Sequence, residues 1–316
     1  MRILDRDNGI PAVILMAYGS PNSLEEVADY LAQVRGRGSS PNEIEHLKNR
    51  YQRVGGRTPL LQITKAQSEA LEKKLVGEGV PVRVSYGMKH WHPFVEDVVE
   101  KIDLDNPPAL IGVALAPHYS KLSIGGYEDS VRRGLARKNS NSRFIMVKSW
   151  HLQPSLIKAL SSRVSNKLRE MSDSRETALV FTAHSLPTRA VSAEDPYQAQ
   201  LLQTSKLVAE EAGATKWYFA FQSASGPPGT WLGPSLKEKI SELSRNGTKR
   251  ILVCPVGFVS DHLEILYDLD VEAKEFAESL GMVLDRTPSL NDDPGVIEAL
   301  AATIRPILVR NPIAAI

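Results

Sequence analysis

The sequence contains a single cysteine, and this scarcity excludes two kinds of chemistry. Among 316 residues only Cys254 carries a thiol, and it lies in the apolar run that begins at Ile251. One thiol can form no disulfide within the chain, and it cannot supply the several thiolates that hold an iron–sulfur cluster. We therefore expect no iron–sulfur cluster, and a protein of a reducing compartment.

Long apolar segments and a strong charge bias are also missing. No apolar stretch approaches the roughly 20 residues that a membrane-spanning helix needs, and the first residues are charged where a signal peptide would be apolar. The 38 basic and 37 acidic residues leave a formal charge of +1, which gives no electrostatic reason to expect nucleic acid as a partner. We expect a cytoplasmic protein with no integral membrane segment and no nucleic acid ligand.

Common motifs for nucleotide binding and for serine hydrolysis do not occur. Gly55 and Gly56 follow a helix-like segment, but they lack the lysine of a phosphate-binding loop and the third glycine of a dinucleotide fingerprint. Neither Ser20 nor Ser185 lies in a Gly-x-Ser-x-Gly turn. These absences argue against nucleotide and hydrolase chemistry.

What the sequence does contain is an alternation of short apolar runs with longer amphipathic stretches, which is typical of βαβ units around buried parallel sheets. Strands are predicted at residues 12–18, 82–87, 109–116, 143–147, 177–182, 217–221, 250–254 and 282–286. Helices are predicted between them, at residues 24–34, 64–77, 126–138, 153–171, 196–212, 234–245, 261–279 and 294–308. The pattern predicts the α/β class.

The two halves of the chain resemble each other. Residues 12–21 and 178–187 each form an apolar run followed by alanine, a ring-bearing residue, a small residue and proline, and residues 114–117 have a similar counterpart at 252–255. We therefore predict two Rossmann-like domains with parallel sheets, at residues 1–140 and 141–316, and a cleft between them. The last helix is free to pack back on the N-terminal domain.

Several side chains that carry chemistry follow predicted strands directly. In open α/β sheets ligands bind outside the carboxyl ends of the strands, where adjacent helices diverge. Tyr18, His118, His184 and the loop before Glu264 all occupy such positions, so we expect them to face one cleft. The strand at 82–87 brings a further group to the same side: Lys89, His90 and His92.

Three carboxylates recur every four residues in the predicted helix 261–279, and we call Glu264, Asp268 and Glu272 the carboxylate file. This spacing places them on one helical face, where each like-charged pair costs a few tenths of a kcal/mol. A solvated acidic stripe and a path for a cation or for protons both fit the pattern. Because residues 265–271 contain no lysine or arginine to balance the charge, the path is favoured.

Other motifs have structural alternatives beside their functional interpretations. Asp261 and Glu264 have the spacing of a capping box, so the pair Asp261 and His262 is interpreted as cap plus surface. His184 suits a divalent metal or a proton, although a histidine bonded to a loop carbonyl has the same context. The arginine-rich segment 49–60 suits a planar acidic ligand, and a solvated charged loop is its alternative.

Five ordered segments together resemble the ferrochelatase family: residues 16–21, 49–60, 115–120, 183–187 and 255–264. The resemblance extends over about residues 12–308. It implies a type II chelatase-like fold with two Rossmann-like domains, and insertion of Fe²⁺ into a porphyrin bound in the cleft. Fe²⁺ is then a substrate, and no prosthetic group is expected.

The resemblance also implies roles for individual residues. His184 and Glu264 match the catalytic and metal-binding pair of the family, and Asp268 and Glu272 match metal-binding positions in an acidic file that leads to it. In having a tyrosine at position 18, the sequence resembles the branch of the family that acts on coproporphyrin III. By this resemblance, Tyr18 would be the axial ligand of the product iron. Contacts with the macrocycle or its propionates are implied for Arg35, Arg50, Tyr51, Thr58 and Tyr127.

The implied reaction gives iron coproporphyrin III (coproheme) and two protons, a step of haem biosynthesis. The alternatives are protoporphyrin IX as the substrate, a cobalt or nickel chelatase for sirohydrochlorin, and a noncatalytic porphyrin or haem carrier. Gly36 departs from an arginine pair that some family members show, which weakens the expected propionate clamp. We expect a monomer whose partners are coproporphyrin III, Fe²⁺, an iron donor and an enzyme that processes coproheme.

Overall fold

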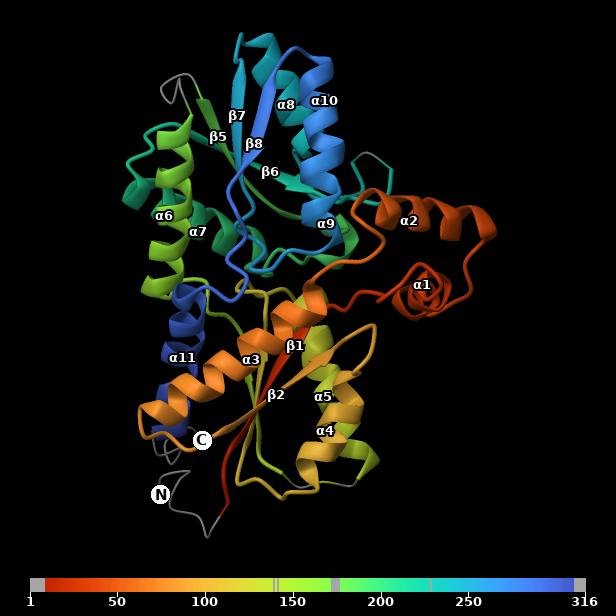
Figure 1. The fold of residues 1–316 in the computed structure, drawn as a ribbon, viewed down its shortest axis with the longest axis vertical. Helices are drawn as coiled ribbons and strands as arrows, with labels where there is room; N and C mark the ends of the chain where they lie inside the picture. Colours follow the sequence, from red (N-terminus) through yellow and green to blue (C-terminus); the bar gives the residue numbers. More distant parts are fainter. Residues whose placement is uncertain (1–8, 139, 141, 172–176, 228, 310–316) are drawn as a thin grey trace.

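The computed structural model describes residues 9–138, 140, 142–171, 177–227 and 229–309, and it contains two parallel sheets of four strands each (Figure 1). The first sheet has the order β2-β1-β3-β4, with β1 (Ala12–Ala17), β2 (Arg83–Met88), β3 (Leu110–Ala114) and β4 (Phe144–Val147). The second has the order β6-β5-β7-β8, with β5 (Thr177–His184), β6 (Trp217–Gln222), β7 (Arg250–Cys254) and β8 (Val283–Arg286). The repeated strand order explains why the two halves of the sequence resemble each other.

The central strands are covered by helices on both faces, which is why they appear in the sequence as continuous apolar runs. Every residue of β1 is buried, and β3 is buried throughout as well. The edge strand β2 begins with exposed Arg83, and β8 begins with exposed Val283. The predicted α/β class with two parallel sheets is confirmed.

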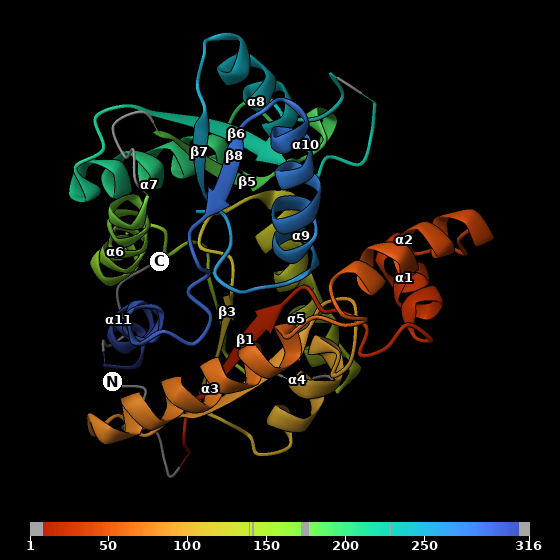
Figure 2. The same cartoon turned by 45° about the horizontal axis from the view of Figure 1, so that its top comes forward.

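The first sheet continues past the domain boundary that was predicted at residue 140. Strand β4 pairs with β3 in register Leu110 to Phe144, so the N-terminal unit includes residues up to Val147. Helix α11 (Pro294–Val309) then returns and packs against both α6 (Pro154–Glu170) and α3 (Leu60–Gly77), as Figures 1 and 2 show. Helix α11 therefore joins the two units.

The remaining helices include two for which the sequence analysis gave no bounds. The helices already expected are α1 (Val27–Arg35), α5 (Gly126–Arg137), α7 (Tyr197–Ala212) and α8 (Leu236–Arg245). No bounds were given for α2 (Pro41–Arg53), which is the helix-like segment before Gly55, or for α4 (Val95–Asp103). In α2 only Tyr51 is fully buried, and its short apolar face, where Leu47 and Tyr51 pack with Val27 and Leu263, lies among many charged residues. Within the described residues, no helix combines the length and apolar character that crossing a bilayer requires.

The single helix predicted at 261–279 is divided into three parts. Helix α9 (Leu263–Leu266) is followed by a π-helical segment at Asp268–Ala273 and then by α10 (Lys274–Ser279). The amide of Glu272 donates to the carbonyl of Tyr267 over 2.9 Å, which is the i to i+5 bond of a π-helix. Such segments are frequent at functional sites, and this one contains the outer half of the carboxylate file.

The predicted capping box at the start of this segment is wrong. His262 occupies the N-cap position in extended conformation, and no side chain caps the helix. The Asp261 carboxylate instead accepts hydrogen bonds from Ser289 Oγ at 2.7 Å and from Asn291 Nδ2 at 3.0 Å. Its role is to hold the preceding loop, which leaves Glu264 free to face the cavity.

Candidate active site

A cavity of about 730 Å³ lies at the carboxyl ends of the strands, and residues of α1 and α2 line part of it. Figure 1 shows these two helices projecting from the rest of the molecule. The volume of the cavity is within the range of small-molecule sites. Tyr18 reaches it from the end of β1, and His184 and Gln222 reach it from the ends of β5 and β6. Strand ends of both sheets therefore converge on one cavity, as the position rule for open sheets predicts.

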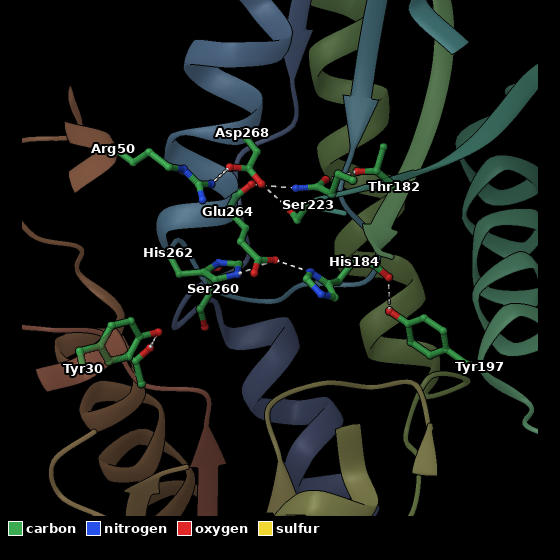
Figure 3. A network of polar contacts seen from close by, with 12 residues as sticks. Tyr30, Arg50, Thr182, His184, Tyr197, Ser223, Ser260, His262, Glu264 and Asp268 are labelled. Carbon is green, nitrogen blue, oxygen red and sulfur yellow. Dashed lines mark hydrogen bonds and ion pairs between the residues drawn. The ribbon is translucent and has the colours of Figure 1, made fainter. Parts of the chain in front are cut away.

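His184 and Glu264 contact each other directly at the cavity wall (Figure 3). His184 Nδ1 lies 2.8 Å from Glu264 Oε2. The buried hydroxyl of Tyr197 donates to the carbonyl of His184 over 3.0 Å, and Gln222 Nε2 donates to the carbonyl of Glu264 over 2.7 Å. Both members of the pair are thus held at their backbones by neighbouring elements.

The pair is partly open to the cavity and strongly coupled. The side chains of His184 and Glu264 are 33% and 29% exposed. Burial alone would lower the pKa of His184, but the charge and hydrogen bond of Glu264 raise it above its ordinary value. Burial likewise opposes the charge of Glu264, yet His184, His262 and Arg50 lower the pKa of that carboxyl. The site can therefore hold a carboxylate next to an imidazole that takes up a proton.

His262 belongs to this site, although the sequence pattern assigned it to cap plus surface. Its Nδ1 lies 3.0 Å from the carbonyl oxygen of Ser260, and its Nε2 lies 4.0 Å from Glu264 Oε2. The interpretation as cap plus surface assumed that the helix includes Asp261 and His262, but His262 is the extended N-cap that precedes the helix. Glu264 consequently lies between two imidazoles (Figure 3).

The second carboxylate of the file, Asp268, is buried and engaged from two sides. Arg50 of α2 forms an ion pair with Oδ1, and the hydroxyl of Ser223 donates to Oδ2. Ser223 has a φ of 63°, a left-handed conformation that is uncommon outside glycine. Burial raises the pKa of Asp268 to about 6, despite the opposing charge of Arg50.

The third carboxylate, Glu272, is half exposed at the outer end of the cavity. Its carboxylate lies 3.2 Å from the ammonium of Lys237, at the start of α8. Although residues 265–271 contain no basic side chain, Arg50 and Lys237 from other elements balance part of the negative charge of the carboxylate file. Among the residues that the structure describes, no three His, Cys, Asp or Glu side chains form a ready-made metal cluster.

Tyr18, Arg35 and Tyr51 also line the cavity. The Tyr18 side chain is 42% exposed on this wall, and its ring centroid lies 4.6 Å from that of His90. Enclosure in the cleft and the charge of Glu264 both raise the pKa of the Tyr18 phenol. Arg35 pairs with Glu43, so this arginine enters the site already bound to a carboxylate.

Thr58 and Tyr127 lie behind the cavity wall. Both are buried, and neither belongs to the residues that line the cavity. Thr58 donates to Ser20 Oγ over 2.9 Å, and Ser20 Oγ lies 3.0 Å from the hydroxyl of Tyr51, so Thr58 is linked to two lining residues. The Tyr127 ring lies 5.3 Å from the Lys89 ammonium.

His118 does not face the cavity, so that expectation is wrong. It is buried against α7, where its Nε2 lies 2.9 Å from the Thr204 hydroxyl. Its ring centroid is 5.6 Å from that of His151. His118 does lie near the carboxyl end of its strand, as expected, but α7 covers this part of the sheet edge.

Comparison with known proteins identifies relatives along nearly the whole chain. The family model described as Ferrochelatase matches residues 11–307. A ferrochelatase of Herpetosiphon aurantiacus is 43% identical over 93% of this chain and 97% of its own length, and one of Deinococcus radiodurans is 40% identical over 92% and 94%. A coproporphyrin III ferrochelatase of Anoxybacillus flavithermus is 36% identical over 93% and 95%. The solved structure of SirB from Bacillus subtilis with Fe³⁺, 14% identical with a TM-score of 0.58 over 94% of this chain and 95% of that one, shares the fold.

Proposed function

Because this chain belongs to the ferrochelatase family and is thus a metal chelatase of haem biosynthesis, we propose that it inserts Fe²⁺ into coproporphyrin III. Relatives named for that substrate are 35–37% identical to this chain, whereas the two at 43% and 40% are named ferrochelatase alone. The observation that carries the substrate choice is Tyr18, a phenol on the same cavity wall as His184 and Glu264. A phenol at this place can become the axial ligand of the product iron.

Substrate recognition rests on cations at the cavity wall. Coproporphyrin III carries four propionates, and guanidinium groups bind carboxylates in bidentate geometry. Arg35 at the end of α1 is the arginine best placed for this role, and Arg37 lies within 3.9 Å of the same Glu43 carboxylate. Gly36 between them is the left-handed C-cap of α1, with a φ of 65°, so a second arginine at that position would be strained.

The reaction must remove two protons from the pyrrole nitrogens as the metal enters. With the Nδ1 proton of His184 shared with Glu264, its Nε2 offers a lone pair, and we assign it as the principal proton acceptor. The charge of Glu264 stabilises the imidazolium that results. Oxygen and nitrogen ligands without thiolate hold Fe²⁺ loosely, which suits transfer rather than storage.

The outer carboxylates extend this site toward the surface. We assign Asp268 and Glu272 to moving iron inward or protons outward. Support comes from Asp268, whose pKa of about 6 lets it gain and lose a proton near neutrality, and from the half-exposed position of Glu272. Arg50 and Lys237 would have to exchange partners as a cation passes.

We propose a cytoplasmic monomer without a prosthetic group, which receives Fe²⁺ from a donor protein and passes coproheme to a processing enzyme. The single cysteine supports a reducing compartment. Thr58 and Tyr127 would act from behind the wall, by supporting the residues that touch the macrocycle.

The assignment of Tyr18 is tested by Tyr18→Phe. Anaerobic assays with Fe²⁺ and coproporphyrin III should show an altered absorption spectrum of the bound product and a turnover that changes by less than about tenfold. An unchanged product spectrum would remove the ligand role of Tyr18. A porphyrin or haem carrier would bind the porphyrin and show no turnover in the same assay.

A further inference from the structure

Gln67 is a fully buried polar residue of helix α3 that reaches across to the C-terminal unit. Its side chain is 0% exposed, and its amide nitrogen donates to Ser260 Oγ over 3.2 Å and to the carbonyl of Asn291 over 2.7 Å. Its carbonyl oxygen has no hydrogen-bond partner among the described residues. Burying an amide with one atom unpaired costs free energy. The two hydrogen bonds that Gln67 donates to the C-terminal unit must offset this cost, so we ask what these bonds hold in place.

The two acceptors of Gln67 are Ser260, which lies in the 259–262 loop, and Asn291, which binds this loop. The loop ends at His262. Asn291 holds this loop at three points: its amide donates to the carbonyl of Val259 over 2.7 Å, its Oδ1 accepts from the amide of Asp261 over 2.8 Å, and its Nδ2 donates to the Asp261 carboxylate over 3.0 Å. Asn291 has a φ of 51°, an uncommon conformation that such contacts stabilise. Gln67 therefore binds the residue that shapes the loop and the loop itself.

The loop determines which nitrogen of His262 carries the proton. A carbonyl oxygen only accepts hydrogen bonds, so the 3.0 Å contact between His262 Nδ1 and the Ser260 carbonyl requires a proton on Nδ1. The neutral ring then has its lone pair on Nε2, the atom that lies 4.0 Å from the Glu264 carboxylate. Rotation of the Ser260 peptide would remove this acceptor and release the ring.

We propose that Gln67 is a positioning residue of the N-terminal domain that fixes the 259–262 loop, and with it the Nδ1–H tautomer and the orientation of His262 beside Glu264. The inference rests on the proposed function only for its activity measurement. It gives the domain interface a part in the reaction centre, because one buried amide connects α3 with the loop.

The test uses the full-length chain with the substitution Gln67→Met, which retains the length of the side chain and removes both donors. Ring nitrogens of the seven histidines are labelled with ¹⁵N, and His262→Asn identifies the signals of His262. In the native protein we expect the Nδ1–H form. In Gln67→Met we expect the Nε2–H form or a mixture, together with a loss of about tenfold in kcat and a porphyrin KM changed by less than twofold.

Gln200→Met is the matched control, because Gln200 also bridges the two units. Its Oε1 accepts from the amide of Tyr119 over 2.7 Å, far in sequence from the 259–262 loop. This variant should leave both the His262 signals and kcat unchanged. Unchanged His262 signals in Gln67→Met, or the same change in both variants, would overturn the proposal.

A second variant decides the question if Gln67→Met does not fold. Ser260→Ala removes one acceptor of Gln67 and leaves the Ser260 carbonyl in place, so a partial shift toward the Nε2–H form is expected. Native signals in a folded Ser260→Ala protein would then contradict the proposal. If the native protein inserts no iron but its His262 tautomer depends on Gln67, the proposed function fails and this inference stands.

Discussion

Glu264 lies between two imidazoles and is held by its own backbone, so small changes in its chemistry should have large effects. His184 Nδ1 contacts its carboxylate at 2.8 Å, His262 Nε2 lies 4.0 Å from the same oxygen, and Gln222 fixes its carbonyl. Removing the charge while keeping the shape isolates the electrostatic part of this arrangement.

The substitution Glu264→Gln should lower kcat for iron insertion by at least about 100-fold, because the imidazolium formed at His184 loses its counter-charge. The measurement is anaerobic turnover with Fe²⁺ and coproporphyrin III. Glu275→Gln is the control, since Glu275 pairs with Arg53 outside the cavity at 57% exposure, and its kcat should remain within about twofold. Native turnover in Glu264→Gln would contradict the role of the carboxylate.

At the scale of single residues, the sequence could predict that His184 and Glu264 face one cavity, but it could not predict the parts of His262 and Gln67. His184 ends an apolar strand and Glu264 lies after the loop that follows another, so both are near the carboxyl ends of strands, where ligands bind. His262 was assigned to cap plus surface because its position beside Glu264 depends on extended backbone at the N-cap. Gln67 could not be predicted, because its hydrogen-bond acceptors come from a segment that is distant in the sequence and meets it only in the folded protein.

Helix α2 is the element that brings Arg50 and Tyr51 to the cavity, and its start is defined by a capping box. Ser40 Oγ accepts from the amide of Glu43 over 3.3 Å, and the Glu43 carboxylate accepts from the Ser40 amide over 2.7 Å. On the inner face of α2, Leu47 and Tyr51 pack in one cluster with Val27 and Leu263, and the cap adds to this packing by satisfying two amides at the start of the helix.

Ser40→Ala should therefore lower the free energy of unfolding by about 1 kcal/mol and raise the porphyrin KM, since the lining residues of α2 become less ordered. Urea denaturation and steady-state kinetics measure the two effects. Ser235→Ala, which removes the equivalent box at the start of α8, should lose a similar free energy. A Ser40→Ala protein as stable as the native one would show that packing, and not the cap, holds α2.

The helical elements show what sequence patterns can and cannot reveal. Helix α3 was predicted at residues 64–77, whereas the mostly polar α2 was recognised only as a helix-like segment before Gly55, without bounds. A pattern search does not detect the π-helical segment at Asp268–Ala273, because its register shift rests on i to i+5 backbone bonds that the order of polar and apolar residues does not encode. The central strands were found because their burial on both faces leaves a continuous apolar run in the sequence.

At the scale of the whole molecule, two buried histidines at the interface of the units make the fold sensitive to acid. Burial and the proximity of His151 lower the pKa of His118 to about 3, and burial lowers the pKa of His151 despite its contact with Gln203. Histidine in the unfolded chain has a pKa of about 6.5. As the pH falls below that value, the unfolded chain takes up protons that the folded chain does not.

The contribution of His118 to the stability of the fold should therefore be complete above about pH 6.5 and decrease toward pH 3, by up to about 1.4 kcal/mol per pH unit, and His151 should contribute in the same direction. Urea denaturation at pH 7.5, 6 and 5 measures the slope, and His118→Asn should make it shallower. Exposed His46→Asn serves as the control and should leave the slope as it is. An equal slope in native and His118→Asn proteins would assign the acid sensitivity to other groups.

The central claim concerns the substrate that enters the cavity between the two units, and one measurement tests it most directly. Initial rates of Fe²⁺ insertion are compared, under identical anaerobic conditions, for coproporphyrin III and protoporphyrin IX. The cation-lined wall and Tyr18 predict a kcat/KM at least about tenfold higher for coproporphyrin III, equivalent to about 1.4 kcal/mol of preferential transition-state binding. Equal or better use of protoporphyrin IX would contradict the account.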